Sequence, residues 1–138
     1  MSSTERFAIV DLSPLKLIKK IAGELIRQER KQRQITQSEL SEEMGFSPRW
    51  LREMEAGAPS TRLEDHFVAT LRLGQSVGHI VLPLLCMAHG IRFPQHLFYE
   101  DLSGLERKCI ELIAEAAINS LKQDLSPQWW PSGESGGN

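Results

Sequence analysis

The sequence predicts an all-α fold, and three observations carry this prediction. Helix-capping signals recur along the chain, each a serine or threonine followed by a proline or by a glutamate three residues later. Between these signals, apolar residues return at intervals of three or four, which is the spacing of one helix face. Glycines stand where such segments would end. Together these signals predict a series of helices from residue 13 to about residue 123.

The first predicted helix begins at Ser13-Pro14 and runs to about Gln34. Proline suits the first helical position, where no amide donor is needed. Gly23 lies inside this helix, where it costs ~1 kcal/mol of helix propensity, so we expect it to mark a close contact or a bend. The inward face of this helix is expected to carry Ile18, Ile21, Leu25 and Ile26.

A short second helix is predicted to start at Gln37. Residues 36–39 read Thr-Gln-Ser-Glu, a capping box in which the threonine hydroxyl accepts from the amide of Glu39 and the glutamate reaches back to the threonine amide. Gly45 ends the helix, because a left-handed residue after the last turn costs least without a Cβ. Leu40 and Met44 fall on the inward face.

A third helix follows after three residues. Ser47 is a good N-cap, Pro48 suits the first helical position, and Gly57 closes the segment. Helical spacing predicts Leu51 and Met54 on the inward face and Arg49, Arg52 and Glu53 on the outward face.

A fourth helix is predicted after Thr61–Glu64, which reads as another capping box. Residues 15–74 would then form one compact helical unit, preceded by an N-terminal arm over residues 1–14. The apolar positions expected to face inward in this fourth helix are Leu63, Phe67, Leu71 and Leu73.

Residues 75–125 are predicted to form a helical extension for packing or dimerisation. Val77–Ala88 reads as a buried helix interrupted by Pro83, and residues 91–99 as an irregular connection. A strongly amphipathic helix is expected over residues 104–123, and its partner would be either the same chain or a second copy. Residues 126–138 read as a disordered tail that carries Trp129-Trp130. The apolar stripe predicted on the last helix comprises Leu105, Cys109, Leu112, Ile113, Ala116, Ala117 and Leu121.

Composition bounds the class of protein. The 138 residues carry a net charge of −2 and two cysteines, which give no disulfide framework. No apolar run reaches the length of a membrane span, and no signal peptide is recognised, so we expect a cytoplasmic protein without membrane attachment. Residues 15–74 hold 11 Lys/Arg and 9 Asp/Glu, a net of +2, whereas residues 75–138 have a net of −3. The small positive excess coincides with the paired short helices, as phosphate binding would require.

The segment over about residues 18–74 resembles the lambda-repressor/Cro family of helix-turn-helix DNA-binding domains, also called the XRE type. The resemblance implies a five-helix lambda-repressor-like domain that binds double-stranded DNA, commonly as a homodimer, with the helix at 48–56 in the major groove. The residues that carry the resemblance are Arg30, Ile35-Thr36-Gln37, Leu40, Met44-Gly45-Phe46-Ser47, Leu51 and Met54-Glu55-Ala56-Gly57.

The resemblance also implies roles for individual residues. Gln37 would touch a phosphate or base at the start of its helix, and Arg30 and Glu55 would form a structural ion pair. Pro48 departs from the glutamine often found there and Trp50 from a small polar residue, so base reading would rest mainly on Arg49. The DNA-facing residues expected from the resemblance are Gln37, Ser47, Pro48, Arg49, Trp50, Arg52 and Glu53.

Other classes of function are less well supported by the sequence. A well-capped helical bundle without DNA binding remains the alternative fold, and an antitoxin-like or adaptor protein that binds a protein partner through residues 75–130 remains the alternative function. No nucleophile motif or phosphate-binding glycine loop points to an enzyme or to a cofactor. His79, Cys86 and His89 share a helical face near His96, but we interpret them as core and partly exposed residues rather than a metal site.

Overall fold

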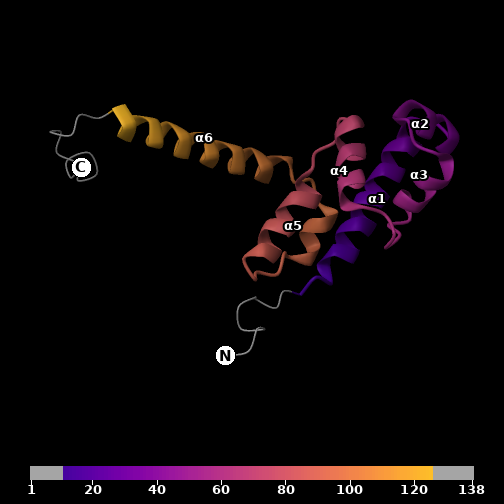
Figure 1. The fold of residues 1–138 in the computed structure, drawn as a ribbon, viewed down its shortest axis with the longest axis horizontal. Helices are drawn as coiled ribbons and strands as arrows, with labels where there is room; N and C mark the ends of the chain where they lie inside the picture. The colour runs from indigo at the N-terminus through magenta and orange to yellow at the C-terminus, as the bar shows by residue number, and fades with distance from the viewer. Residues whose placement is uncertain (1–10, 126–138) are drawn as a thin grey trace. The chain divides into compact units, whose positions relative to one another are not determined.

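The structure is a computed structural model that describes residues 11–125, and over that range it is all-helical, as predicted, with six α-helices and no strand (Figure 1). The chain divides into two compact units, one ending at Ser103 and one beginning at Gly104, and each is described by itself. The elements are α1 (Pro14–Gln32), α2 (Gln37–Met44), α3 (Pro48–Glu55), α4 (Leu63–Arg72), α5 (Gly78–Ala88), the 3-10 helix η2 (Gln95–Tyr99) and α6 (Ser103–Leu125).

Local capping chemistry sets the start and end of α1. Pro14 occupies the first turn as predicted, but the side chain of Ser13 makes no capping bond. Instead the Ser13 amide donates to the Asp11 carboxylate at 2.9 Å, which holds the pKa of Asp11 below its usual value. The helix ends at Gln32, two residues earlier than predicted, and Gln34 turns the chain with a φ of 57°.

The two short helices begin and end as the sequence predicts. The Thr36 hydroxyl accepts from the Glu39 amide at 3.1 Å, although the Glu39 carboxylate meets the threonine hydroxyl rather than its amide. Gly45 follows α2 in the left-handed region with a φ of 77°. The Ser47 hydroxyl then caps α3 by accepting from the Trp50 amide at 3.1 Å. Local sequence therefore fixes the three-residue connection between α2 and α3.

The predicted capping box at Thr61–Glu64 is wrong. Arg62 is the N-cap residue of α4 and provides no side-chain cap. The Thr61 hydroxyl is instead held by the Ala58 carbonyl at 2.5 Å and by Nε2 of His66 at 2.9 Å. The Thr61 hydroxyl, which the sequence predicted as the helix cap, is therefore used in a tertiary contact with His66.

His66 is the buried polar centre of α4. Its ring is 0% exposed, and Nδ1 has no hydrogen-bond partner among the described residues. Burial, assisted by the positive charge of Lys19, lowers the pKa of His66 from 6.5 to about 4. The imidazole is therefore neutral at physiological pH.

Helix α1 is the central element of the first unit, because α3, α4 and α5 all pack against it (Figure 1). Gly23 lies where α1 crosses the end of α3: a Cβ there would come within 2.1 Å of the Met54 carbonyl oxygen. Of the two alternatives expected at Gly23, a close contact or a bend, the structure shows the close contact. One core cluster joins Ile26, Leu40, Met44, Leu51, Met54, Ala69 and Leu73, and a second joins Ile18, Ala22, Ile80 and Phe98.

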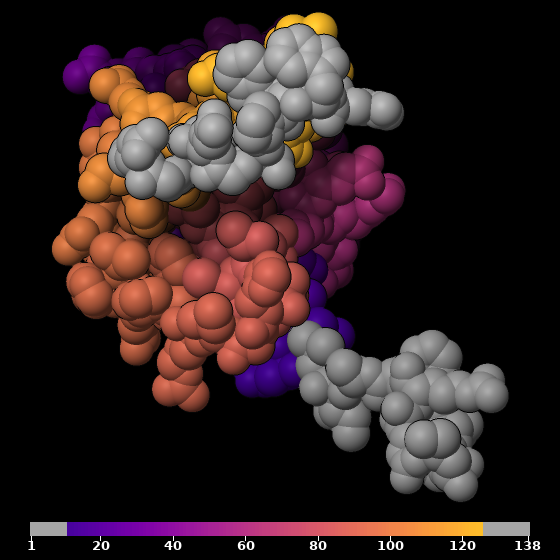
Figure 2. Space-filling model, turned by 90° about the vertical axis from the view of Figure 1, so that its left-hand side faces the viewer, coloured from indigo at the N-terminus to yellow at the C-terminus, as the bar shows by residue number. Residues whose placement is uncertain are grey.

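Helix α5 belongs to the same compact unit as α1–α4. Its Ile80 is buried against Ile18 of α1, and Pro83 is accommodated inside the helix. The division between the compact units therefore does not coincide with the predicted boundary at residue 74. Figure 2 shows the side chains of residues 78–99, in salmon and orange, gathered on one face of this unit.

Three apolar positions of the first unit were expected inside but are exposed. Leu71 of α4 is 53% exposed, so its predicted inward position is wrong, whereas Leu73, also predicted to face inward, is buried. Val81 and Leu85 of α5 are 36% and 55% exposed, so α5 is buried on one side only. The other side of α5 carries a solvent-facing apolar pair four residues apart.

Helix α6, taken by itself, is a 23-residue helix in which no residue is buried. Its start is fixed by Asp101, whose carboxylate accepts from the Ser103 amide at 3.0 Å and whose pKa is lowered by that bond. Cys109, which the sequence placed on the apolar stripe of this helix, is a free and half-buried cysteine. The predicted apolar stripe is present but uncovered.

Three predictions fall wholly or largely outside the described residues: the N-terminal arm up to residue 10, the disordered tail over residues 126–138, and the tandem tryptophan Trp129-Trp130. Within residues 11–125, none of the helices combines the length and the apolar character that crossing a membrane requires.

Candidate nucleic-acid interface

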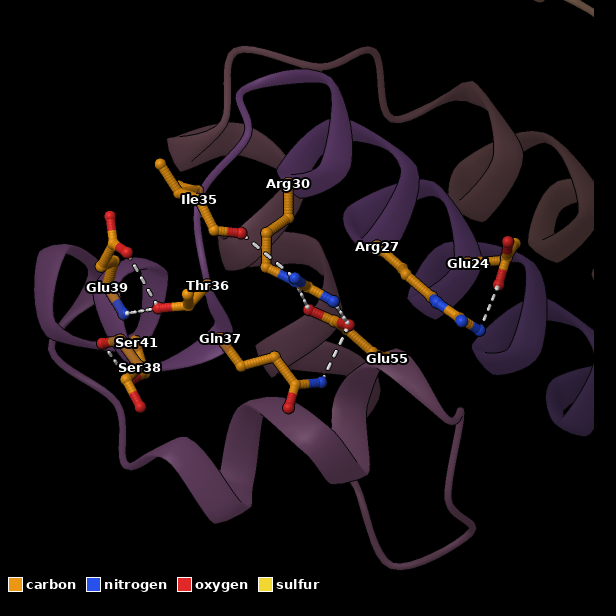
Figure 3. Close-up of polar contacts among 10 residues, drawn as sticks. All are labelled: Glu24, Arg27, Arg30, Ile35, Thr36, Gln37, Ser38, Glu39, Ser41 and Glu55. Carbon is orange, nitrogen blue, oxygen red and sulfur yellow. Dashed lines mark hydrogen bonds and ion pairs between the residues drawn. The ribbon is translucent and has the colours of Figure 1, made fainter.

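A buried carboxylate joins the helices on which the candidate interface is built. The Arg30 guanidinium donates from Nε to Glu55 Oε2 at 2.8 Å and from Nη2 to Glu55 Oε1 at 2.9 Å (Figure 3). The ion pair expected between Arg30 and Glu55 is therefore present, and its bidentate geometry is the strong form of such a pair. The bonds to Glu55 raise the pKa of Arg30 above its ordinary value.

The same carboxylate positions the start of α2. Gln37 Nε2 donates to Glu55 Oε1 at 3.1 Å, and Arg30 Nη1 donates to the Ile35 carbonyl at 3.2 Å (Figure 3). Glu55 at the end of α3 thus holds α1 through Arg30 and the first residue of α2 through Gln37, while Arg30 in turn holds the loop at Ile35. Sequence reasoning expected Gln37 to meet DNA, whereas in the free chain its amide is engaged with Glu55.

The outer face of α3 carries the polar side chains predicted there. The Arg49 side chain is 83% exposed, and its Nε lies 3.4 Å from Oε1 of Glu53 one turn further. Arg52 is exposed as well. On the inner face, Leu51 and Met54 are both 0% exposed. The register of α3 is therefore fixed by its core residues, which leave the arginines pointing outward.

Pro48 and Ser47 lie at the solvent-exposed start of α3. Pro48 has no hydrogen-bonding side chain, and the Ser47 hydroxyl is engaged as the cap. Both residues therefore position α3, and any contact to a nucleic acid through polar side chains would come from the residues that follow them.

Trp50 packs within the chain instead of standing free at the surface. Its ring lies 4.2 Å, centroid to centroid, from that of Phe46, and the two stack at 35°. The Arg72 guanidinium lies over the Phe46 ring, 5.6 Å from its centroid, and also donates a hydrogen bond to the Met44 carbonyl. Sequence reasoning missed Arg72, because no local signal links residues so far apart in the chain.

An open depression lies beside the Arg30–Glu55 pair, where α1, the loop after it and the end of α3 meet. Three of its lining residues are arginines, of which Arg27 also stands 4.0 Å from Glu24. Exposed guanidinium groups and amides around a shallow hollow suit an anionic backbone better than an apolar ligand. The depression is lined by Arg27, Arg30, Gln34, Ile35, Thr36, Gln37, Arg52, Glu55 and Ala56.

The histidines and Cys86 do not form a metal centre in the described part of the chain, where no three His, Cys, Asp or Glu side chains converge. His79 is buried, and its Nε2 lies 2.7 Å from the Glu100 carbonyl oxygen. This bond explains the position of His79 without a ligand.

Comparison with known proteins found no match among protein-family models, curated proteins or solved structures. The functional argument therefore rests on the residues and geometry described above.

Proposed function

We propose that this chain is a sequence-specific, DNA-binding transcriptional regulator of the XRE type, in which α2 and α3 form a helix-turn-helix. The observation that carries the proposal is the outer face of α3, where Arg49 and Arg52 are exposed on a helix anchored by fully buried Leu51 and Met54. A helix held in this way offers rigid, outward-pointing donors, which reading base edges requires.

In the proposed mechanism α3 enters the major groove. Arg49 would donate to O6 and N7 of a guanine, and Glu53 would accept from a cytosine N4. The 3.4 Å contact between Arg49 and Glu53 is long and exposed, so exchanging it for base contacts costs little. Arg52 would assist from the next turn.

Phosphate contacts would come from the rim of the depression beside Arg30. Gln37 begins α2, whose N-terminal amides and partial positive charge favour an anion. Arg27 and Arg52 flank the same depression. These contacts would position the chain on the duplex without reading its sequence, and a homodimer would engage two half-sites about 34 Å apart.

The direct test is selection of binding sites from a random duplex pool with the purified chain at several salt concentrations. We expect an enriched, roughly two-fold symmetric motif whose affinity falls steeply with salt. Retention of all sequences alike, or of none, would contradict the proposal.

A matched pair of variants tests the role assigned to α3. Arg49→Ala should abolish discrimination between the selected site and scrambled duplexes, which is worth about 1–3 kcal/mol for a bidentate contact. Arg62→Ala removes the same charge from another exposed arginine, one that pairs with Glu64 at 2.9 Å, and should leave site preference unchanged. Equal behaviour of the two variants would remove Arg49 from the base-reading role.

A second candidate function is a protein-interaction module of the antitoxin or adaptor kind, acting through residues 75–130. The observation that favours it is the set of exposed large apolar side chains on α6, a helix with no buried residue. Recovery of a stable hetero-complex from the native cell, together with no selection of any duplex, would favour this function over the first.

A further inference from the structure

Helix α6 carries an apolar surface that its own compact unit leaves uncovered. The structure describes the helix in full, from Ser103 to Leu125, and none of its residues is buried. Most of its large apolar side chains are more than half exposed, a pattern that single surface leucines do not explain. These side chains are Ile110 at 64%, Leu112 at 66%, Ile113 at 64%, Ile118 at 55%, Leu121 at 57% and Leu125 at 75%.

One face of α6 has the spacing of a helix-pairing seam. Ile110, Ala114, Ala117 and Leu121 follow one another at intervals of four, three and four residues, as the a and d positions of paired helices do. Ile113 and Ile118 flank this seam on its two sides, which widens it. The seam is thus bulky toward its ends and small in the middle.

Charged residues extend the same seam at both ends. Arg107 lies three residues before Ile110, and Asp124 lies three residues after Leu121, so the heptad spacing continues through both. The seam therefore begins with a positive residue and finishes with a negative one.

We propose that α6 pairs antiparallel with α6 of a second copy of this chain. In the register that the seam defines, Ile110 faces the partner's Leu121, Ala114 faces the partner's Ala117, and Arg107 faces the partner's Asp124. Each contact occurs twice, because the two helices are related by a two-fold axis.

Charge and size both select this arrangement. A parallel pair in register would set Arg107 against the partner's Arg107 and Asp124 against the partner's Asp124, and like charges at facing positions repel. The antiparallel pair instead makes two opposite-charge contacts. At its centre the alanines Ala114 and Ala117 let the two backbones approach closely.

The exposed apolar area also matches a second copy. Ile110, Ile113, Ile118 and Leu121, on the seam and its flanks, are each 55–64% exposed, so a second helix would have a contiguous apolar face to cover. The pairing does not depend on DNA binding, so it stands or falls separately from the proposed function.

Two matched variants measured by sedimentation equilibrium test the interface. Ile110→Glu places a charge in the seam and should weaken the dimer at least about a hundredfold. Leu112→Glu introduces the same charge at an equally exposed position about 200° further round the helix and should leave the dimer intact. Because both residues are exposed in the chain, circular dichroism should report an unchanged fold for each. A monomeric parent chain, or equal loss of dimer in both variants, would overturn the proposal.

The orientation is tested by charge exchange and by cross-linking. Arg107→Asp alone should weaken the dimer about tenfold, and adding Asp124→Arg in the same chain should restore it. With Cys86 and Cys109 replaced by serine, a mixture of Ile110→Cys and Leu121→Cys chains should form a disulfide between unlike chains. Ile110→Cys alone should not, since its two copies would lie roughly 16 Å apart along the axis. Efficient self-linking of Ile110→Cys would overturn the antiparallel register.

Discussion

Gly23→Ala is expected to destabilise the first unit, although it replaces a helix-breaking residue by the best helix former. A Cβ built on Gly23 lies 2.1 Å from the Met54 carbonyl oxygen and 2.9 Å from that of Glu55. Real Cβ atoms essentially never come within 3.0 Å of such neighbours, and backbone oxygens cannot swing away as a side-chain end can. The substitution must therefore push α1 and α3 apart at their crossing.

The size of this effect follows from two opposing terms. Helix propensity favours alanine by ~1 kcal/mol. Overpacking costs about 1–3 kcal/mol, and the upper part applies here because the α1–α3 separation also strains the Arg30–Glu55 bonds. We expect a net loss of about 2 kcal/mol in the free energy of unfolding.

Urea unfolding followed by circular dichroism measures this loss directly. Gly104→Ala is the control, because Gly104 also lies in a helix but no atom stands within 4 Å of its added Cβ. That variant should be neutral or slightly stabilising. A Gly23→Ala protein as stable as the parent would refute the close crossing of α1 and α3.

Two further predictions concern buried polar groups. The pKa of His66 is about 4 in the folded chain and 6.5 in the unfolded chain, so the unfolded chain takes up a proton first as the pH falls. The contribution of the neutral ring to the free energy of unfolding is therefore complete above pH 6.5 and is lost as the pH falls toward 4. Urea unfolding at a series of pH values should show that the parent protein loses up to about 3 kcal/mol of unfolding free energy between pH 6.5 and 4, and that His66→Gln does not. If the unfolding free energies of the two proteins fell in parallel with pH, the loss could not be assigned to His66. Glu55→Gln leaves the Arg30 charge without its carboxylate and should cost about 3 kcal/mol in thermal or urea unfolding, whereas a loss below 1 kcal/mol would show that the pair contributes little.

The parts of the fold that were predictable from the sequence depend on local chemistry. The cap at Ser47, the left-handed glycine at position 45 and the packing role of Gly23 each follow from a residue and its near neighbours in sequence. The Arg30–Glu55 pair joins residues 25 apart and came from the family resemblance instead. Local rules therefore located the helices and the close approach at Gly23, but not the ion pair between α1 and α3.

The predictions that failed depend on contacts far along the chain. Thr61 has a sequence context suited to capping, but its hydroxyl is taken by the buried ring of His66. The stacking of Arg72 on Phe46 joins α4 to the connection before α3, and nothing in the intervening residues indicates it. Apolar spacing alone likewise placed both Leu71 and Leu73 inside, whereas only Leu73 is buried.

The anchoring of α3 has a consequence for how such a surface can change over generations. The residues that hold the helix, Leu51, Met54 and Glu55, are all buried, and the exposed Arg49 and Arg52 take no part in the core. Substitutions on the outside can therefore accumulate without loss of folding, since exposed positions usually change stability by less than about 0.5 kcal/mol. The outer side chains of α3 can therefore be replaced while the buried residues keep the helix in place. Under the proposed function, a new binding preference could arise in this way without compensating changes in the core.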